Sequence, residues 1–217
     1  MTGPRLAVVL AGGEGRRMGG GKPLRRFGET TLVARMLELA RSYCPQVAVA
    51  VRDASQVAGA VDAPLICDDP TIGGPLAGLA SALHYARELG VSSVLTLPCD
   101  APGVPNDLAV RLAGALTSRE GVAVAQSAGR LHPTCALWNA STLDILPAYL
   151  ASGQRSLRGL ASAAGMVVVT WECEGSDPFA NANTQDDLTA LQPRPAKTGI
   201  GPAQSMAAIP GGALRLD

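Results

Sequence analysis

A glycine-rich stretch with three basic residues is the first part of the sequence that could do chemistry. Residues 10–23 read LAGGEGRRMGGGKP, so Arg16, Arg17 and Lys22 lie among six glycines. Glycines let backbone N–H groups approach phosphate oxygens without an intervening Cβ atom, and the cations can neutralise a triphosphate. The stretch therefore predicts a phosphate-binding loop, in which Arg16 and Lys22 would bear the charge that develops on a leaving pyrophosphate. The alternative, a merely flexible loop, leaves the three cations unexplained.

Two familiar phosphate-binding motifs do not fit this stretch. The dinucleotide fingerprint GxGxxG fails because Met18 stands where its third glycine belongs. The P-loop, GxxxxGK followed by Ser or Thr, fails because Arg16 stands at its first glycine and Pro23 at its last position. The loop therefore belongs to neither class.

Asp100 is the carboxylate best placed to hold a metal ion. It follows a strand-like run and lies between two prolines, in the segment PCDAP at residues 98–102. Mg²⁺ typically takes one or two carboxylates together with substrate phosphate oxygens. An aspartate that caps the next helix is the alternative, but Asn106 is expected to fill that position. We therefore expect Asp100 to bind Mg²⁺.

Other polar residues add to this picture. Asp68 and Asp69 follow another strand-like run, where they could supply a second carboxylate or contact the ribose or base of a nucleotide. GGPLAG at residues 73–78 predicts a tight turn into a helix whose N-terminus points toward the same edge. His132 could be a catalytic base. If the nucleophile is a phosphate group, however, it is already ionised and needs no base. We therefore expect His132 to be structural or to contact substrate.

Strand-like and helix-like segments alternate along the chain, and this alternation must position the candidate residues. It predicts an α/β fold of three layers, Rossmann-like, with a mostly parallel central sheet between helices. Ligands bind at the carboxyl ends of such strands, so the loops at 12–22, 68–75 and 98–105 should meet there. We expect strands at 6–10, 47–51, 65–67, 94–97, 122–125, 134–137 and 166–171, and helices at 30–41 (capped by Thr30 or Thr31), 76–89, 106–116, 141–150 and 185–191.

Composition excludes several classes of protein. The chain has 217 residues, of which 18 are basic and 18 acidic, so its formal net charge is zero. It therefore lacks the excess positive charge that favours general binding to nucleic acid or to an anionic membrane. Aromatic residues make up 3%, too few to stack bases as single-strand binders do. Five cysteines without a CxxC pair indicate reduced thiols, and the apolar run at 6–11 is too short for a signal peptide or a membrane span. We expect a cytoplasmic protein without nucleic-acid or membrane partners.

The character of the chain changes at Pro193. Residues 193–217 are rich in proline and glycine and show little apolar periodicity. We expect one domain over residues 1–192 and a flexible Pro/Gly-rich extension over 193–217, for which an interaction tail is the alternative.

Several of these motifs together resemble one enzyme family. LAGG at residues 10–13, followed by Arg16, Met18-Gly19 and Lys22-Pro23, is similar to the signature with which nucleotidyltransferases load an NTP. Over about residues 6–191 the chain resembles the MobA-type molybdenum cofactor guanylyltransferases. The motifs that narrow the match are GPLAG at 74–78, PCD at 98–100, HP at 132–133 and FANANTQDDL at 179–188.

The resemblance implies an Mg²⁺-dependent transfer of GMP from GTP to molybdenum-molybdopterin. The acceptor phosphate would attack the α-phosphorus in line and expel pyrophosphate, with Mg²⁺ on Asp100 bridging acceptor and α-phosphate. The implied partners are GTP, molybdenum-molybdopterin and proteins of cofactor synthesis and molybdoenzyme maturation. The alternatives are cytidylyl transfer to the same cofactor, transfer to another small phosphorylated acceptor, and a non-enzymatic module that binds nucleotide and delivers cofactor.

The resemblance also implies roles for single residues. Lys22 matches the lysine that reaches the phosphates, and Asp100 the aspartate that binds both Mg²⁺ and nucleotide. Asp68 matches a nucleotide-binding aspartate, with Asp69 as the alternative. Ala50 departs from the family, because some members have an asparagine there that contacts nucleotide. The remaining implied residues are Leu10, Ala11 and Gly12 for backbone contacts to the nucleotide, Gly13 for phosphate space, and His132, Asn181 and Asn183 for substrate.

Overall fold

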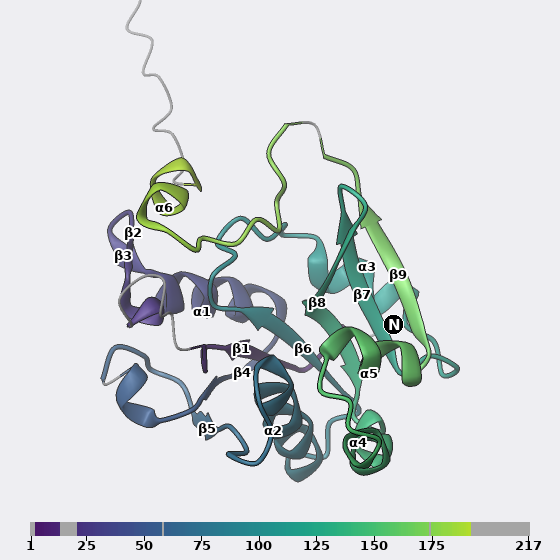
Figure 1. Cartoon of the computed structure of the whole chain (residues 1–217). Helices are drawn as coiled ribbons and strands as arrows, with labels where there is room; N and C mark the ends of the chain where they lie inside the picture. Colours follow the sequence, from purple (N-terminus) through teal and green to yellow (C-terminus); the bar gives the residue numbers. More distant parts are fainter. Residues whose placement is uncertain (1–2, 14–20, 58, 174, 192–217) are drawn as a thin grey trace, which may run out of the picture.

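The buried apolar run at residues 6–10 forms the central strand of a seven-stranded sheet (Figure 1). The structure is a computed structural model that describes residues 3–13, 21–57, 59–173 and 175–191. All residues of β1 (Leu6–Leu10) except the last are fully buried. It pairs in parallel with β4 (Gln46–Val51) on one side and β6 (Ser93–Pro98) on the other. A strand covered on both faces accounts for the lack of polar residues in this run.

The strand order is β5-β4-β1-β6-β8-β7-β9. Strand β8 runs antiparallel to both of its neighbours, and the other pairs are parallel. This arrangement confirms the prediction of a mostly parallel α/β sheet. The remaining strands are β5 (Leu65–Cys67), β7 (Val122–Ser127), β8 (Arg130–Asn139) and β9 (Met166–Trp171).

Alternate residues of β1 face two separate hydrophobic cores. Ala7 and Val9 belong to the core under α1 and α3, whereas Leu6 and Val8 belong to the core under α2, α4 and α5. Figure 1 shows these two groups of helices on opposite faces of the sheet, which gives the predicted three layers. The helices are α1 (Leu32–Tyr43), α2 (Pro75–Glu88), α3 (Leu108–Ala115), α4 (Thr142–Ala151), α5 (Leu157–Ala163) and α6 (Gln185–Leu191), with 3₁₀ turns η2 (Lys22–Leu24) and η3 (Ala54–Gln56) and a ribbon of β2 (Arg26–Phe27) and β3 (Thr30–Thr31).

The starts of α1 and α2 follow from their first residues. Thr31 Oγ1 accepts the N–H of Ala34 at 3.3 Å, which confirms Thr31 rather than Thr30 as the cap of α1. Helix α2 starts with Pro75, whose missing N–H is not needed there. Gly74 precedes it with φ of 66°, a backbone conformation that favours glycine. The turn before α2 therefore requires the glycine that the sequence supplies.

The prediction that Asn106 caps α3 is wrong. The N-cap residue is Asp107, and its side chain makes no capping hydrogen bond. Instead the Asp107 carboxylate accepts the indole N–H of Trp171 at 2.8 Å and forms an ion pair with Arg111. A tertiary contact to β9 therefore replaces the expected local one. Helix α5 was not predicted, and neither was the β2–β3 ribbon, whose two-residue strands are too short to show a periodic pattern.

Two further sequence expectations concern the chain as a whole. Within the described residues, none of the helices combines the length and apolar character needed to cross a membrane. Each of the five cysteines is a free thiol, and burial raises the pKa of Cys44 to about 12. The extension at 193–217 lies outside the described residues, so the domain boundary at residue 192 stays a prediction.

Candidate active site

A cavity of about 900 Å³ opens at the carboxyl ends of the strands β1, β4, β5 and β6. Residues from all three predicted post-strand loops line it, as expected for an open parallel sheet. Its lining includes the candidate residues Leu10, Ala11, Gly12, Gly13, Lys22, Asp68, Asp100, Asn181 and Asn183.

The first loop leaves β1 with its backbone still bonded to the sheet. The N–H of Ala11 donates to the carbonyl of Ala50 at 2.8 Å, so the loop starts in a fixed position. At Gly12 a Cβ atom would lie 2.1 Å from Asp68 Oδ2, so the close approach to that carboxylate requires glycine. Arg16 lies outside the described residues, and its role stays a prediction.

Lys22 bonds both Asp100 and Asn183 at one side of the cavity. Lys22 Nζ lies 2.5 Å from Asp100 Oδ2 and donates to Asn183 Oδ1 at 2.9 Å. Lys22 is the first residue of η2, and Gly21 precedes it with φ of 61°. Asp100 follows directly after β6 and Cys99. The structure therefore brings a cation and a carboxylate together at the strand ends, where the polyphosphate of a nucleotide would need both.

Asp68 lines the cavity and has one buried carboxylate oxygen. Its Oδ1 atom has no hydrogen-bond partner among the described residues. Burial raises the pKa of the Asp68 carboxyl, and the guanidinium of Arg52 partly opposes this shift. Asp69 differs, because its Oδ1 atom accepts both the N–H and the hydroxyl of Thr71, at 2.8 and 2.7 Å. Asp69 is thus engaged in a local turn, whereas Asp68 can accept a donor from a ligand.

Asn181 and Asn183 come from the segment between β9 and α6. The N–H of Ala182, between them, donates to the carbonyl of Asp100 at 2.8 Å. Asp187 Oδ2 accepts the N–H groups of Asn183 and Thr184 at 2.8 and 2.9 Å, and these bonds lower the pKa of Asp187. Both ends of this short stretch are therefore held, which orients the two asparagines toward the cavity.

His132 is not among the described residues that line the cavity. Its Nε2 atom lies 2.7 Å from Ser127 Oγ, and its ring stacks on Phe179 with centroids 4.8 Å apart. Burial lowers the pKa of His132, and the carboxylate of Asp177 partly opposes this shift. The contact of His132 with substrate stays a prediction.

Two cavity residues, Thr134 and Arg52, were not predicted from the sequence. Thr134 lies where the pairing of β7 and β8 shifts: Val124 opposes Ala136, but the next residue opposes His132. Pro133 cannot donate to a β-ladder and could have signalled this irregularity. Arg52 is the first residue after β4, and only its place at a strand end could have indicated a role.

Comparisons with known proteins agree with this geometry. Residues 7–169 match the family model for the MobA-like NTP transferase domain. A molybdenum cofactor guanylyltransferase of Rhodopseudomonas palustris (strain BisB5) is 40% identical over 194 residues, which cover 86% of this chain and 91% of the relative. A protein of the same name from Sinorhizobium fredii is 39% identical over 194 residues, covering 84% and 88%.

Solved structures show the same fold. The molybdopterin-guanine dinucleotide biosynthesis protein A of Archaeoglobus fulgidus superposes with a TM-score of 0.68 at 23% identity, covering 85% of this chain and 95% of that one. Rv0371C of Mycobacterium tuberculosis, solved in complex with manganese, superposes with a TM-score of 0.61 at 17% identity, covering 87% and 97%.

The Rossmann-like sheet and the site at its carboxyl edge define a nucleotidyltransferase, and the chain belongs to the MobA-like NTP transferase domain family. Within it the chain belongs to the molybdenum cofactor guanylyltransferases. The resemblance, the fold class and the enzyme class predicted from the sequence are confirmed.

Proposed function

We propose that the protein transfers GMP from GTP to molybdenum-molybdopterin and releases pyrophosphate. The observation that carries this proposal is the pair of Lys22 and Asp100, 2.5 Å apart in a cavity that Gly12 and Gly13 also line. A lysine ammonium neutralises phosphate oxygens, and an aspartate at a strand end binds the cation that accompanies them. Arg16, from the same loop, is the second candidate for neutralising pyrophosphate.

The reaction needs positioning and charge neutralisation more than a base. A phosphate oxygen of the acceptor forms a bond to the α-phosphorus, while the bond from that phosphorus to the bridging oxygen of the β-phosphate breaks. The acceptor phosphate is already ionised, so no proton must be removed from it. Neither histidine is among the described residues that line the cavity, in agreement with a mechanism without a histidine base.

Mg²⁺ is the proposed metal cofactor. Asp100, Asn181 and Asn183 line the cavity, and their side chains offer oxygen ligands. No group of three or more His, Cys, Asp and Glu residues is placed to hold a metal within the described ranges. This fits Mg²⁺, which relies on few carboxylates and on substrate phosphates. When bound by Asp100, the ion would supply positive charge to the α-phosphate and the acceptor oxygen. The manganese in the Mycobacterium tuberculosis protein supports a divalent cation.

Asp68 is the proposed acceptor for the guanine base. Guanine presents two kinds of donor, N1–H and N2–H, on its pairing edge, whereas cytosine presents only the N4 amino group. The unpartnered Oδ1 of Asp68 can accept such a donor. Leu10, Ala11 and Gly12 would contact the nucleotide through the backbone, and Gly13 would leave space for its phosphates.

The acceptor would bind near Asn181 and Asn183, and the guanine base near Asp68. Both asparagines line the cavity and flank the N–H that holds Asp100. Their amide groups offer donors and acceptors to a pterin. His132 is not among the described residues that line the cavity, so its effect on the acceptor would pass through other residues. The product must reach the enzymes that use it, so proteins of cofactor synthesis and molybdoenzyme maturation are the expected protein partners.

Pyrophosphate release tests the proposal. The wild-type protein with GTP, Mg²⁺ and molybdenum-molybdopterin should release pyrophosphate, and omission of any one component should stop the release. Absence of release from the complete mixture would favour a module that binds nucleotide and delivers cofactor without catalysis.

A further inference from the structure

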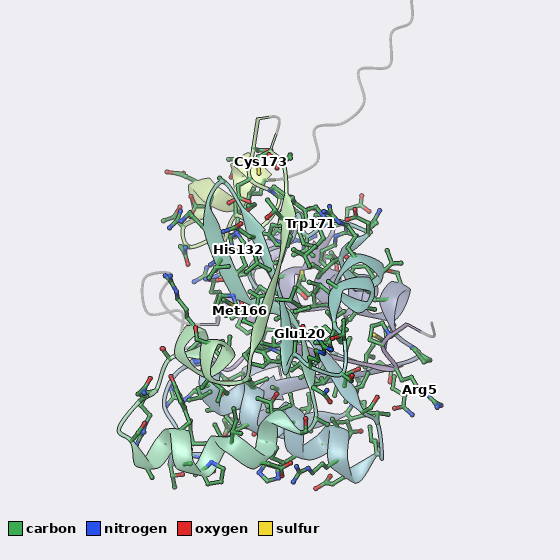
Figure 2. The ribbon with its side chains drawn as sticks, turned by 90° about the vertical axis from the view of Figure 1, so that its right-hand side faces the viewer. Arg5, Glu120, His132, Met166, Trp171 and Cys173 are labelled. Carbon is green, nitrogen blue, oxygen red and sulfur yellow. The ribbon has the colours of Figure 1, made fainter. Side chains whose placement is uncertain are left out.

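The segment at residues 177–183, here called the strap, connects the β7–β8 hairpin to Lys22 and Asp100, here called the catalytic pair. It follows β9 and carries Asn181 and Asn183 to the cavity. Figure 2 shows His132 and Trp171 toward the same end of the sheet, away from Met166 and Glu120. The strap contacts β7, β8 and β9, which do not bear Lys22 or Asp100, through Ser127, His132 and Trp171.

The first half of the strap is fixed to β7 and β8 by buried polar contacts. Ser127, which is fully buried, donates its hydroxyl to Asp177 Oδ1 at 2.6 Å. The same oxygen of Asp177 accepts the N–H of Phe179 at 2.9 Å. The Phe179 ring is 2% exposed, stacks on His132 and meets Trp171 edge-on at 5.3 Å. The strap is thus anchored by one carboxylate and one ring.

The hydrogen bonds of this anchor have a direction. The Ser127 hydroxyl has one proton and donates it to Asp177. Its oxygen must therefore accept from His132, whose Nε2 atom lies 2.7 Å away and carries the proton. A charged carboxylate at the end of such a chain makes the bonds stronger than neutral ones. The three side chains form a chain of two hydrogen bonds, in which His132 donates to Ser127 and Ser127 donates to Asp177.

The second half of the strap contacts the catalytic pair directly. The N–H of Ala182 donates to the carbonyl of Asp100, and Asn183 Oδ1 accepts from Lys22 Nζ. The strap also passes close to the loop after β6, because a Cβ atom on Gly103 would lie 3.1 Å from the Pro178 carbonyl oxygen. A displacement of the strap would therefore move both partners of the pair.

We propose that His132 is a positioning residue, which acts through Ser127 and Asp177 to hold the strap against Lys22 and Asp100. The role rests on the proposed function of the cavity, but the position of the strap can be measured separately. His132 does not reach the reacting atoms in this arrangement. Its effect on catalysis is transmitted by Asn183 and by the backbone of Ala182.

Hydrogen exchange of the strap amides tests the placement without any substrate. His132→Leu removes the Nε2–H donor and keeps an apolar side chain, and Asp177→Asn removes the charged acceptor. Each change weakens the chain of hydrogen bonds that ends on Asp177, and exchange in the peptide over 177–184 should therefore be faster by about ten-fold or more in both variants. His132→Gln places an amide N–H near the Nε2 position, so its exchange should stay close to that of the wild type. Thr170→Ala is the matched control, because the Thr170 hydroxyl donates to Gln126 on the adjacent strand and not to a residue of the strap.

Turnover then tests the link to the catalytic pair. In His132→Leu, kcat should fall about ten-fold, and the Kd of GTP should rise by less than in Lys22→Ala, because Lys22 is displaced and not removed. His132→Gln should restore most of kcat.

Unchanged strap exchange in both His132→Leu and Asp177→Asn would overturn the proposal, whatever the activity. Faster exchange with wild-type kcat, or a His132→Gln variant as slow as His132→Leu, would overturn it as well. If the wild type shows no transfer at all, the proposed function fails, and the exchange data still decide the placement of the strap.

Discussion

The ammonium of Lys22 and the carboxylate of Asp100 lie 2.5 Å apart, although 78 positions separate them in the sequence. Their side chains are 14% and 19% exposed, so solvent screens the pair only partly. β1 and β6 are adjacent parallel strands, and this adjacency brings together the loops that follow them. The order of the strands therefore brings Lys22 and Asp100 together. It also places them at the carboxyl edge of the sheet, where a nucleotide would bind.

Asp100→Ala should abolish most of the turnover and leave the fold intact. It removes the carboxylate proposed to bind Mg²⁺, and loss of one transition-state charge interaction lowers kcat by about 10² to 10³. Steady-state pyrophosphate release measures the effect. Asp144→Ala is the control, because Asp144 pairs with Arg87 and is exposed. Wild-type rates in Asp100→Ala would contradict the metal role.

Lys22→Ala should weaken GTP binding. A hydrogen bond to a charged group contributes about 1.5–3 kcal/mol, so we expect the Kd of GTP to rise by about ten- to a hundred-fold. Titration calorimetry with GTP measures the change, and Arg87→Ala serves as a matched loss of an exposed cation. An unchanged Kd in Lys22→Ala would show that the lysine does not reach the phosphates.

Asp68→Asn should stabilise the protein and weaken GTP binding. Burial raises the pKa of Asp68 in the folded state. A raised pKa contributes stability below the unfolded value, and that contribution is lost as the pH rises through the folded pKa. The charged carboxylate is therefore unfavourable at pH 7, and its removal should raise Tm by about 2 °C there. The gain should shrink as the pH falls toward the unfolded value of about 3.9, because the wild-type carboxyl then loses its charge as well. A lower Tm at pH 7 would contradict this account.

Gly12→Ala should disturb the base side of the cavity. The new Cβ atom would lie 2.1 Å from Asp68 Oδ2, so the carboxylate must move. We expect a loss of about 1–3 kcal/mol in the free energy of unfolding and a higher Kd for GTP. Denaturant unfolding checks the first and calorimetry the second. Gly114→Ala, where a Cβ atom meets nothing within 4 Å, should not destabilise the protein.

The stability of the wild type should fall as the pH drops below about 6.5. Burial lowers the pKa of His132 in the folded state. A lowered pKa gives stability that is present above the unfolded value and lost as the pH falls toward the folded one. Tm measured between about pH 7.5 and 5.5 should therefore decrease, and less so in His132→Gln. An equal decrease in both proteins would assign the effect to other groups.

Much of this site could be predicted because its residues follow strands with strong sequence patterns. The apolar runs before Gly12 and Asp100 indicate fully buried strands, and parallel topology then places the loops at one edge. The choice between Asp68 and Asp69 could not be made this way. It depends on Thr71, which holds Asp69 in a turn.

Other features depend on contacts between distant segments and leave no local signal. Asp107 contacts Trp171, 64 positions away, instead of capping its own helix. The same holds for the strap, because only the folded chain places Asp177 beside Ser127.

The transfer of labelled nucleotide tests the central claim most directly. Wild-type protein is incubated with Mg²⁺, molybdenum-molybdopterin and either GTP or CTP labelled at the α-phosphate, and the label joined to the acceptor is measured. The account predicts label transfer from GTP, with release of pyrophosphate and little transfer from CTP. Transfer from CTP alone, or no transfer from either nucleotide, would contradict it.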